Sequence, residues 1–341
     1  MNNIPFINIV RVITIFGVIL AHLPIPENLC KFISIFRMPL FFFVSGYLVS
    51  FKDIAFKDFL QKKLKTLILP YFWFAVITFL FWYFAGRKYG DDALNPGDPV
   101  KFLLGIFLAI PSKEFLGFNI PIWFLPCLFF TESLFFMIRK HFANREFLLI
   151  IPLFVIGLFI KEITPIPLPW GLNISICALL FFYTGYLLRK QGFGEFHINK
   201  LSYIKRVAVS IMFLLLTILF SYLNEERVEF YLLEFGNYVL FFSGAFSGIV
   251  FVVFLSSCIS NNRLWTFYGR NTIIILGFHF LSFTFIKGIQ FFVLKIPLDI
   301  INGSVIYNII YALLSFVILA PVIIFINKYC PFLLGRKKAI G

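Results

Sequence analysis

Charged side chains are scarce in this chain, and acidic ones most of all. Only 13% of the 341 residues are charged, and 16 of them are aspartate or glutamate, whereas an ordinary soluble domain is about a quarter charged. So few charges exclude the class of water-soluble globular proteins. With 60% hydrophobic residues and a mean hydropathy of +0.93, the composition is that of an integral membrane protein.

Cysteine is sparse as well. The five cysteines are Cys30, Cys127, Cys177, Cys258 and Cys330. They stand singly, and most fall inside apolar stretches, so neither a disulfide framework nor a CxxC metal site is indicated. A signal-peptide pattern is also missing, because the first hydrophobic run has no basic leader and no clear small-residue cleavage site. We therefore expect this run to remain as the first helix, and we expect no metal site.

Apolar windows of about 20 residues, the length that crosses roughly 30 Å of hydrocarbon, follow one another along nearly the whole chain. They predict an all-α, polytopic membrane bundle of about ten transmembrane helices, forming a single membrane-embedded domain over residues 1–341. The predicted spans are 5–23, 32–51, 64–85, 120–139, 147–161, 172–189, 205–223, 236–258, 271–294 and 304–328. A further run, 101–111, is too short to span and is expected to lie at the interface or to re-enter the membrane.

The formal net charge of +14 reflects topology. Basic residues follow every second predicted helix and close the chain, namely Lys52, Lys57, Lys62, Lys63, Lys65, Arg139, Lys140, Arg145, Arg189, Lys190, Lys200, Lys205, Arg206, Arg263, Arg270, Lys328, Arg336, Lys337 and Lys338. This is the positive-inside pattern of a multi-pass inner (plasma) membrane protein with both termini in the cytoplasm. It leaves no reason to expect nucleic acid as a partner. Two polar loops, 86–101 and 161–171, are predicted on the outer side, where long ordered loops tend to be functional.

Ionisable residues remain inside several predicted spans, although each costs roughly 2.5–3.5 kcal/mol on insertion scales. These residues are Arg11, His22, Arg37, Glu132, His279 and Lys287. Arg11 and His22 are eleven residues apart, which at 100° per residue is about 20° from a whole number of turns and roughly 16 Å along the axis. A stripe of Arg11, Ile15, Val18 and His22 is therefore expected to face the bundle interior. Alternatively, the histidine is an interfacial hydrogen-bonding residue and the arginine snorkels to the headgroups.

The second span runs back from the outer side, which puts Arg37 at a depth close to that of His22. The sequence thus predicts an outer polar pocket near these two residues. Deeper in the same span, Ser45 and Gly46 are small enough to let helices pack closely.

Four strings together resemble the acyltransferase-3 family of multipass membrane O-acyltransferases, in particular its fucose 4-O-acetylase-like branch. They are Arg11 with His22 after ten residues, "RMPLFFFVSGYL" at 37–48, "KKLKTLILPYFWF" at 62–74 and "IWFLPCLFF" at 122–130. The string "YGRNTIIILGFH" at 268–279 is similar to a late family helix with a glycine after a loop and a histidine about ten residues later. The resemblance covers nearly the whole chain.

The resemblance implies transfer of an acyl group, usually acetyl from acetyl-CoA, to a sugar hydroxyl of a cell-envelope or exported polysaccharide. The partners would be acetyl-CoA, a glycan or lipid-linked saccharide acceptor and membrane lipids, with no bound cofactor. His22 would be the catalytic base, since an imidazole with an ordinary pKa near 6.5 suits that task, and Arg11 its partner. An acyl-histidine intermediate remains an alternative. The predicted substrate-binding residues are Arg37, Lys62, Lys65, Trp123, Glu132 and His279.

Two features depart from the family pattern. Where members have an R-x-x-R pair entering the third helix, this chain has Lys62 and Lys65; lysine keeps the charge but loses the bidentate fork for phosphate, so a topogenic lysine cluster is the alternative. Glu132 lies nine residues after Trp123 and does not match the acidic residue of another branch. A transporter or flippase for a lipid-linked sugar remains the competing hypothesis, because buried charges in a multi-helix protein suit one as well.

Overall fold

The computed structural model is helical throughout the part of the chain that it describes, residues 5–50, 54–88, 97–163, 168–192, 197–198 and 200–336. No strand occurs within these ranges, and the only extended pairing there is an isolated antiparallel bridge between Glu229 and Glu234. The all-α prediction is confirmed. Lys52, Lys337, Lys338 and the central parts of both predicted outer loops, 89–96 and 164–167, lie outside the described residues.

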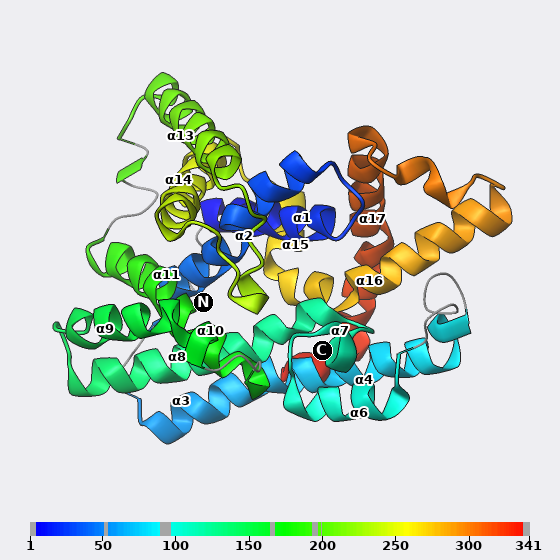
Figure 1. Cartoon of the computed structure of the whole chain (residues 1–341), viewed down its shortest axis with the longest axis horizontal. Helices are drawn as coiled ribbons and strands as arrows, with labels where there is room; N and C mark the ends of the chain where they lie inside the picture. Colours follow the sequence, from blue (N-terminus) through cyan, green and yellow to red (C-terminus); the bar gives the residue numbers. More distant parts are fainter. Residues whose placement is uncertain are drawn as a thin grey trace. The chain divides into compact units, whose positions relative to one another are not determined.

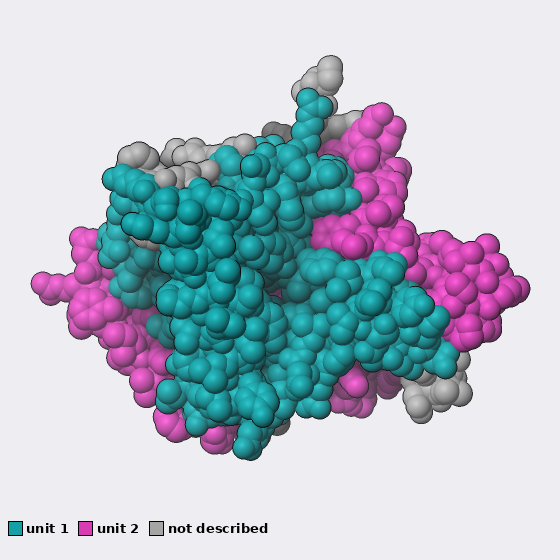
Figure 2. Space-filling view, turned by 90° about the horizontal axis from the view of Figure 1, so that it is seen from above, with its two compact units in different colours: residues 1–50, 180–272, 299–312 teal, residues 51–179, 273–298, 313–341 magenta. Residues whose placement is uncertain are grey.

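The chain divides into two compact units, coloured separately in Figure 2. Unit 1 comprises residues 1–50, 180–272 and 299–312, and unit 2 comprises residues 51–179, 273–298 and 313–341. Two long helices, α11 (Leu172–Lys190) and α17 (Val305–Tyr329), contribute residues to both units. The single membrane domain expected over residues 1–341 stays a prediction.

Unit 1 is built around α2. Besides parts of α11 and α17, its elements are α1 (Pro5–Ala21), α2 (Glu27–Leu48), α13 (Tyr203–Leu223), η5 (Phe230–Leu232), α14 (Tyr238–Ser257), α15 (Arg263–Arg270) and η7 (Leu298–Ile301). Helices α1, α13 and α14 all pack against α2, and α13 and α14 lie side by side (Figure 1). Asparagine side chains cap α14 and α15, since Asn237 and Asn262 accept hydrogen bonds from the first free N–H groups of these helices.

Glycines set the closest helix contact in unit 1. A Cβ atom on Gly46 of α2 would collide with the Phe182 carbonyl of α11, and a Cβ on Gly185 of α11 would collide with the Phe43 carbonyl of α2. The two backbones therefore touch directly, which is the small-residue packing typical of membrane helices. The packing role predicted for Gly46 is confirmed. The hydroxyl of Ser45 donates to the Phe41 carbonyl of its own helix at 2.9 Å.

Unit 2 begins with one long helical run that changes its pitch. This run consists of α3 (Phe56–Lys63), the π-helix η1 (Leu64–Ile68) and α4 (Leu69–Phe84). The unit continues with η2 (Gly86–Lys88), α6 (Pro99–Leu108), α7 (Lys113–Leu116), η3 (Ile120–Trp123), α8 (Phe124–His141), α9 (Phe147–Leu158), α10 (Ile160–Ile163), η4 (Pro169–Gly171), α16 (Thr272–Gly288), η6 (Ile289–Val293) and η8 (Pro331–Leu334). Parts of α11 and α17 complete it.

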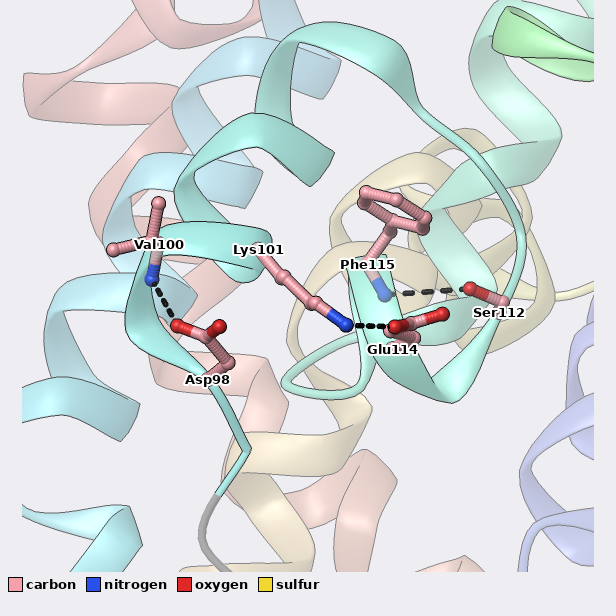
Figure 3. A network of polar contacts seen from close by, with 6 residues as sticks. All are labelled: Asp98, Val100, Lys101, Ser112, Glu114 and Phe115. Atoms are coloured by element: carbon pink, nitrogen blue, oxygen red, sulfur yellow. Dashed lines mark hydrogen bonds and ion pairs between the residues drawn. The ribbon is translucent and has the colours of Figure 1, made fainter.

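The run at 101–111 that was predicted to be too short to span forms a helical hairpin, α6–α7 (Figure 3). Asp98 caps α6 by accepting an N–H at 2.8 Å, and Ser112 caps α7 in the same way at 3.3 Å. An ion pair between Lys101 and Glu114 joins the two helices. The outer face of α6 exposes apolar side chains, namely Val100, Leu103, Leu104 and Phe107. This exposed apolar face is typical of a segment that lies against lipid.

Eight helices are long and apolar enough to cross a membrane, within the described part of the chain. They are 27–48, 56–88, 120–141, 169–190, 203–223, 238–257, 272–293 and 305–329. The predicted spans at 5–23 and 147–161 appear as shorter apolar helices, α1 with 17 residues and α9 with 12. A multi-pass membrane protein is therefore supported, while the count of ten and the cytoplasmic termini stay predictions.

Candidate functional site

Arg11 lies on the face of α1 that packs against α15. Its Nη1 donates a long hydrogen bond of 3.4 Å to the backbone carbonyl of Gly269. Gly269 allows this approach, because a Cβ atom at that position would lie 2.6 Å from the Asn8 carbonyl oxygen and 2.7 Å from the Asn8 Cα. Gly269, the glycine of the "YGRN" string, thus lets the backbone of α15 touch that of α1 at Asn8, about one helical turn before Arg11.

The guanidinium of Arg11 keeps most of its donors available. Among the described residues it makes no hydrogen bond or ion pair besides the one to Gly269, and a guanidinium has five N–H donors. The side chain is half-buried. The other partly exposed residues in the middle of α1, Ile13, Phe16 and Gly17, lie roughly 140–240° around the helix from Arg11. Arg11 therefore projects from the opposite, buried side of α1.

His22 lies just beyond α1, which ends at Ala21, and its side chain is exposed. The backbone N–H of His22 bonds the Ile19 carbonyl at 3.2 Å. Two residues on, the Pro24 carbonyl accepts hydrogen bonds from the Gly303 N–H at 2.9 Å and from the Asn308 Nδ2 at 3.1 Å. The turn that presents the imidazole is therefore tied to the start of α17.

The predicted stripe along α1 is only partly regular. Ile15 and Val18 are buried at 0% and 4% exposure, so the Arg11–Ile15–Val18 portion faces protein as expected. His22 leaves the helical path, because the chain has already entered the turn. The two ionisable groups share unit 1, with Arg11 set in the packed helix and His22 in the turn that follows it.

Arg37 is the third predicted site residue in unit 1 and is nearly inaccessible, with 7% of its surface exposed. It lies at the middle of α2, and the charges of Arg227 and Glu229, in the segment between α13 and α14, act on it. Glu229 provides its strongest favourable charge interaction. Arg37 thus belongs to a charged cluster with Arg227 and Glu229, and the outer polar pocket stays a prediction.

In unit 2 the lysine that turns inward is Lys63. Lys62 and Lys65, the predicted phosphate-binding pair, are both exposed. Lys63 forms an ion pair with Glu132 of α8, whose side chain is only 5% exposed. The π-helix η1 begins directly after this lysine, and π-helical turns are frequent at functional sites. The sequence analysis predicted Glu132 as a site residue but did not predict Lys63 as its ion-pair partner.

Trp123 and His279 are buried in unit 2. Trp123 ends η3 immediately before α8, with 4% of its surface exposed. His279 has 0% exposure, and its Nδ1 lies 2.9 Å from the Leu276 carbonyl of its own helix. Nearby in sequence, Asn119 donates to the Gly277 carbonyl at 2.8 Å and to the Thr78 hydroxyl at 3.3 Å, which links α4, η3 and α16. Neither Asn119 nor Thr78 was among the predicted residues.

The predicted residues thus separate by unit. Arg11, His22 and Arg37 belong to unit 1, whereas Lys62, Lys65, Trp123, Glu132 and His279 belong to unit 2. Chemically, unit 1 offers an accessible imidazole as a proton acceptor and guanidinium donors for an anion or a carbonyl oxygen. Within the described ranges, no three histidine, cysteine or acidic residues are grouped in a way that would hold a metal ion.

Comparison with known proteins identifies a family for this chain. The acyltransferase-3 family model, described as an acyltransferase domain, matches residues 4–327, nearly the whole chain. Searches of curated proteins and of solved structures found no match.

Proposed function

Because the chain belongs to the acyltransferase-3 family, we propose that it moves an acetyl group from acetyl-CoA to a sugar hydroxyl of a cell-envelope or exported polysaccharide, acting in the inner membrane. The family indicates an acyltransferase, and the eight long apolar helices support a multi-pass membrane protein. The single observation on which the proposal mainly depends is the family match over residues 4–327. It does not favour the transporter or flippase hypothesis.

His22 is the proposed general base. Its imidazole accepts the proton of the sugar hydroxyl while the hydroxyl oxygen attacks the thioester carbonyl carbon. The tetrahedral intermediate then collapses, the carbon–sulfur bond breaks, and the CoA sulfur leaves and takes a proton back from the imidazolium. The exposed position of His22 supports this role, because a base must come within hydrogen-bond reach of its substrate. Transfer through an acyl-histidine remains the alternative sequence of steps.

Arg11 is the proposed partner on the donor side. Its hydrogen bond to Gly269, which no other described residue supplements, leaves further N–H donors on the buried side of α1. In such a low-dielectric setting, a guanidinium stabilises a phosphate of CoA or the oxyanion of the intermediate more strongly than it would in water.

The other proposed substrate-binding residues divide by accessibility. Lys62 and Lys65 are exposed and are proposed to meet CoA phosphates as point charges. For Trp123, Glu132 and His279, all buried, we propose a positioning role. Arg37 is proposed to act on the acceptor.

The deciding experiment replaces His22 with alanine. In a folded, membrane-inserted protein, His22→Ala should lower acetyl transfer by about 10²–10⁴-fold, the usual contribution of a general base. His141→Ala is the matched control, because His141 is exposed at the end of α8 and should keep wild-type activity. The assay follows acetyl-CoA consumption together with the mass of acetyl groups on the saccharide. Unchanged transfer in His22→Ala would exclude the catalytic assignment.

Arg11→Gln tests the donor side separately. We expect a raised KM for acetyl-CoA with the acceptor preference unchanged, since the lost charge would face the donor. An unaltered dependence on acetyl-CoA concentration would contradict this role.

A further inference from the structure

Arg37 is a buried cation without a hydrogen-bond partner in the described part of the chain. Its Nη1 is fully enclosed, yet no donor–acceptor pair or ion pair involving this guanidinium is formed there. Burying a charge is costly unless it is paired and hydrogen-bonded. A guanidinium kept in this condition therefore points to a partner that arrives from outside the protein.

The charges around Arg37 leave an excess of one positive charge. Arg227 and Glu229 both act on it, but Glu229 is already engaged, because its Oε1 lies 2.8 Å from the Arg227 Nε. Two arginines against one carboxylate sum to +1. Glu229 is the carboxylate of this loop whose charge acts on Arg37, whereas Glu225, Glu226 and Glu234 are exposed and Glu234 acts on Tyr231 instead. The charged groups that act on the Arg37 guanidinium, counted together with it, thus leave one positive charge unbalanced.

A polar stripe on α2 leads along the helix to the guanidinium. Cys30, Ser34 and Arg37 are spaced four and three residues apart and so lie on one face of α2. The Cys30 Sγ and Ser34 Oγ are 3.9 Å apart, and both side chains are buried. A thiol and a hydroxyl beside the cation supply further hydrogen-bonding groups for a polar ligand.

The segment that carries Arg227 and Glu229, residues 224–237, is held by several contacts. Phe230 packs against Phe42 of α2 with ring centroids 5.7 Å apart. Glu229 and Glu234 exchange backbone hydrogen bonds of 2.8 and 3.2 Å. The Asn224 side chain fastens both arms of the loop, donating to the Phe235 carbonyl at 3.0 Å and accepting the Asn237 N–H at 2.9 Å. Such preorganisation lowers the entropic cost of binding.

Tyr231 adds a neutral phenol to the groups around Arg37. Burial is the main cause that raises the pKa of its phenol, and the Glu229 carboxylate raises it further, against Arg227 and Arg37, which lower it. The hydroxyl therefore stays protonated at neutral pH and can donate to an anion.

We propose that Arg37, Arg227 and Tyr231 form a subsite for one anionic group, a carboxylate or a phosphate, of the acceptor saccharide. This inference rests on the proposed function, which supplies the saccharide. A single negative charge would neutralise the cluster, and the planar guanidinium fork matches two oxygens of a carboxylate or phosphate. The acceptor would then be an acidic sugar or a sugar phosphate such as a lipid-linked precursor, and a purely neutral glycan would bind less well.

Titration calorimetry on the purified full-length protein in detergent tests the subsite with three probes: glucuronate, glucose 1-phosphate and glucose. At least one charged probe should bind about tenfold or more tightly than glucose, the factor expected for a charge-assisted hydrogen-bonded pair. Preference for glucuronate indicates a carboxylate on an acidic sugar, and preference for glucose 1-phosphate indicates the phosphate of a carrier-linked precursor. Equal affinity for all three would overturn the proposal.

Variants separate the subsite from general charge effects. Arg37→Gln should abolish the preference for the charged probe, and Arg37→Lys should keep part of it, since lysine retains the charge without the fork. Arg227 is 39% exposed, so Arg227→Gln should fold; it leaves Arg37 and Glu229 balanced and should likewise remove the preference. Arg263→Gln, at an exposed arginine of α15, should not change it. A preference that survives in Arg227→Gln would refute the subsite even if Arg37→Gln does not fold.

Acetyl transfer is measured in parallel, so that a failure of the proposed anion subsite can be distinguished from a failure of the proposed acetyltransferase function. A wild-type protein that transfers acetyl but binds the charged probes no better than glucose would remove the subsite alone. An Arg37-dependent preference without any acetyl transfer would remove the proposed function and leave an anion site in unit 1.

Discussion

Adding one methyl group at Gly269 should disturb both the packing of α1 and the position of its arginine. The Cβ of Gly269→Ala would lie 2.6 Å from the Asn8 carbonyl oxygen, while ordinary van der Waals contact begins at 3.4 Å. To remove the clash, α1 and α15 must move apart by roughly 0.8 Å, the difference between 3.4 and 2.6 Å. A rotamer change cannot relieve the contact, because the Asn8 oxygen and Cα that the new methyl group meets belong to the backbone.

The same movement acts on Arg11. Its Nη1 is 3.4 Å from the Gly269 carbonyl, so a further shift of this size takes the pair beyond hydrogen-bonding distance. Overpacking costs about 1–3 kcal/mol, and losing a weak charge-assisted hydrogen bond adds about 1 kcal/mol. We expect Gly269→Ala to lower the free energy of unfolding by about 2–4 kcal/mol and to raise the KM for acetyl-CoA.

Reversible unfolding in mixed detergent micelles measures the first effect, and initial rates of acetyl-CoA consumption measure the second. Gly17→Ala is the matched control in the same helix, α1, because its Cβ would meet only the Ile33 Cγ2 of α2, at the ordinary contact distance of 3.4 Å, and alanine favours the helix by about 1 kcal/mol. If Gly269→Ala were as stable and as active as Gly17→Ala, the close contact between α1 and α15 would be refuted.

Three further substitutions probe contacts that the helix packing creates. Asn308→Leu removes the amide donor to the Pro24 carbonyl, in the turn that presents His22. Because this carbonyl keeps its hydrogen bond from the Gly303 N–H, the free energy of unfolding should fall by only about 1–2 kcal/mol. The kcat for acetyl transfer should fall, with an unchanged KM. Glu132→Ala should destabilise the protein by about 3 kcal/mol, because it leaves Lys63 partly buried and unpaired. The double variant with Lys63→Ala should recover most of this loss, as measured by thermal unfolding. A coupling energy below about 0.5 kcal/mol between the two substitutions would contradict the ion pair. Gly46→Ala should lower the unfolding free energy by about 3 kcal/mol in the same assay, since its Cβ meets the α11 backbone, and wild-type stability would refute that contact.

The helices themselves were predictable, because backbone groups in lipid must bond within their own segment and apolar windows therefore mark spans. Ends of helices were harder to predict. The window at 147–161 yields α9, Phe147–Leu158, whose 12 residues extend only about 18 Å at 1.5 Å per residue. Hydropathy responds to composition alone, whereas tertiary contacts decide where a helix stops.

The candidate site shows the same limit. The 100° rule placed Arg11 with Ile15 and Val18 on one buried face, and this is what α1 has. The rule does not extend to His22, because it holds only inside a helix and α1 ends at Ala21. Pro24, three residues past that end, was the available signal for a helix terminus.

Arg37 was predicted to lie in an outer polar pocket, but its partners were not. Arg227 and Glu229 are about 190 positions away in sequence. No periodicity within α2 identifies the loop that packs against it, since that pairing includes the contact of the Phe230 ring with the Phe42 ring. Long-range contacts of this kind depend on the whole fold.

Lys63 illustrates the opposite case, a residue that local spacing would have revealed. Phe59, Lys63 and Leu67 are four residues apart, and Phe59 and Leu67 are buried at 2% and 6% exposure. A lysine between two buried residues at this spacing shares their face, so it turns inward and requires an acidic partner, which Glu132 supplies. The R-x-x-R pattern drew attention to Lys62 and Lys65 instead. Helical phase was the better guide here, because burial follows the face of a helix and an inward lysine is stable only when its charge is compensated.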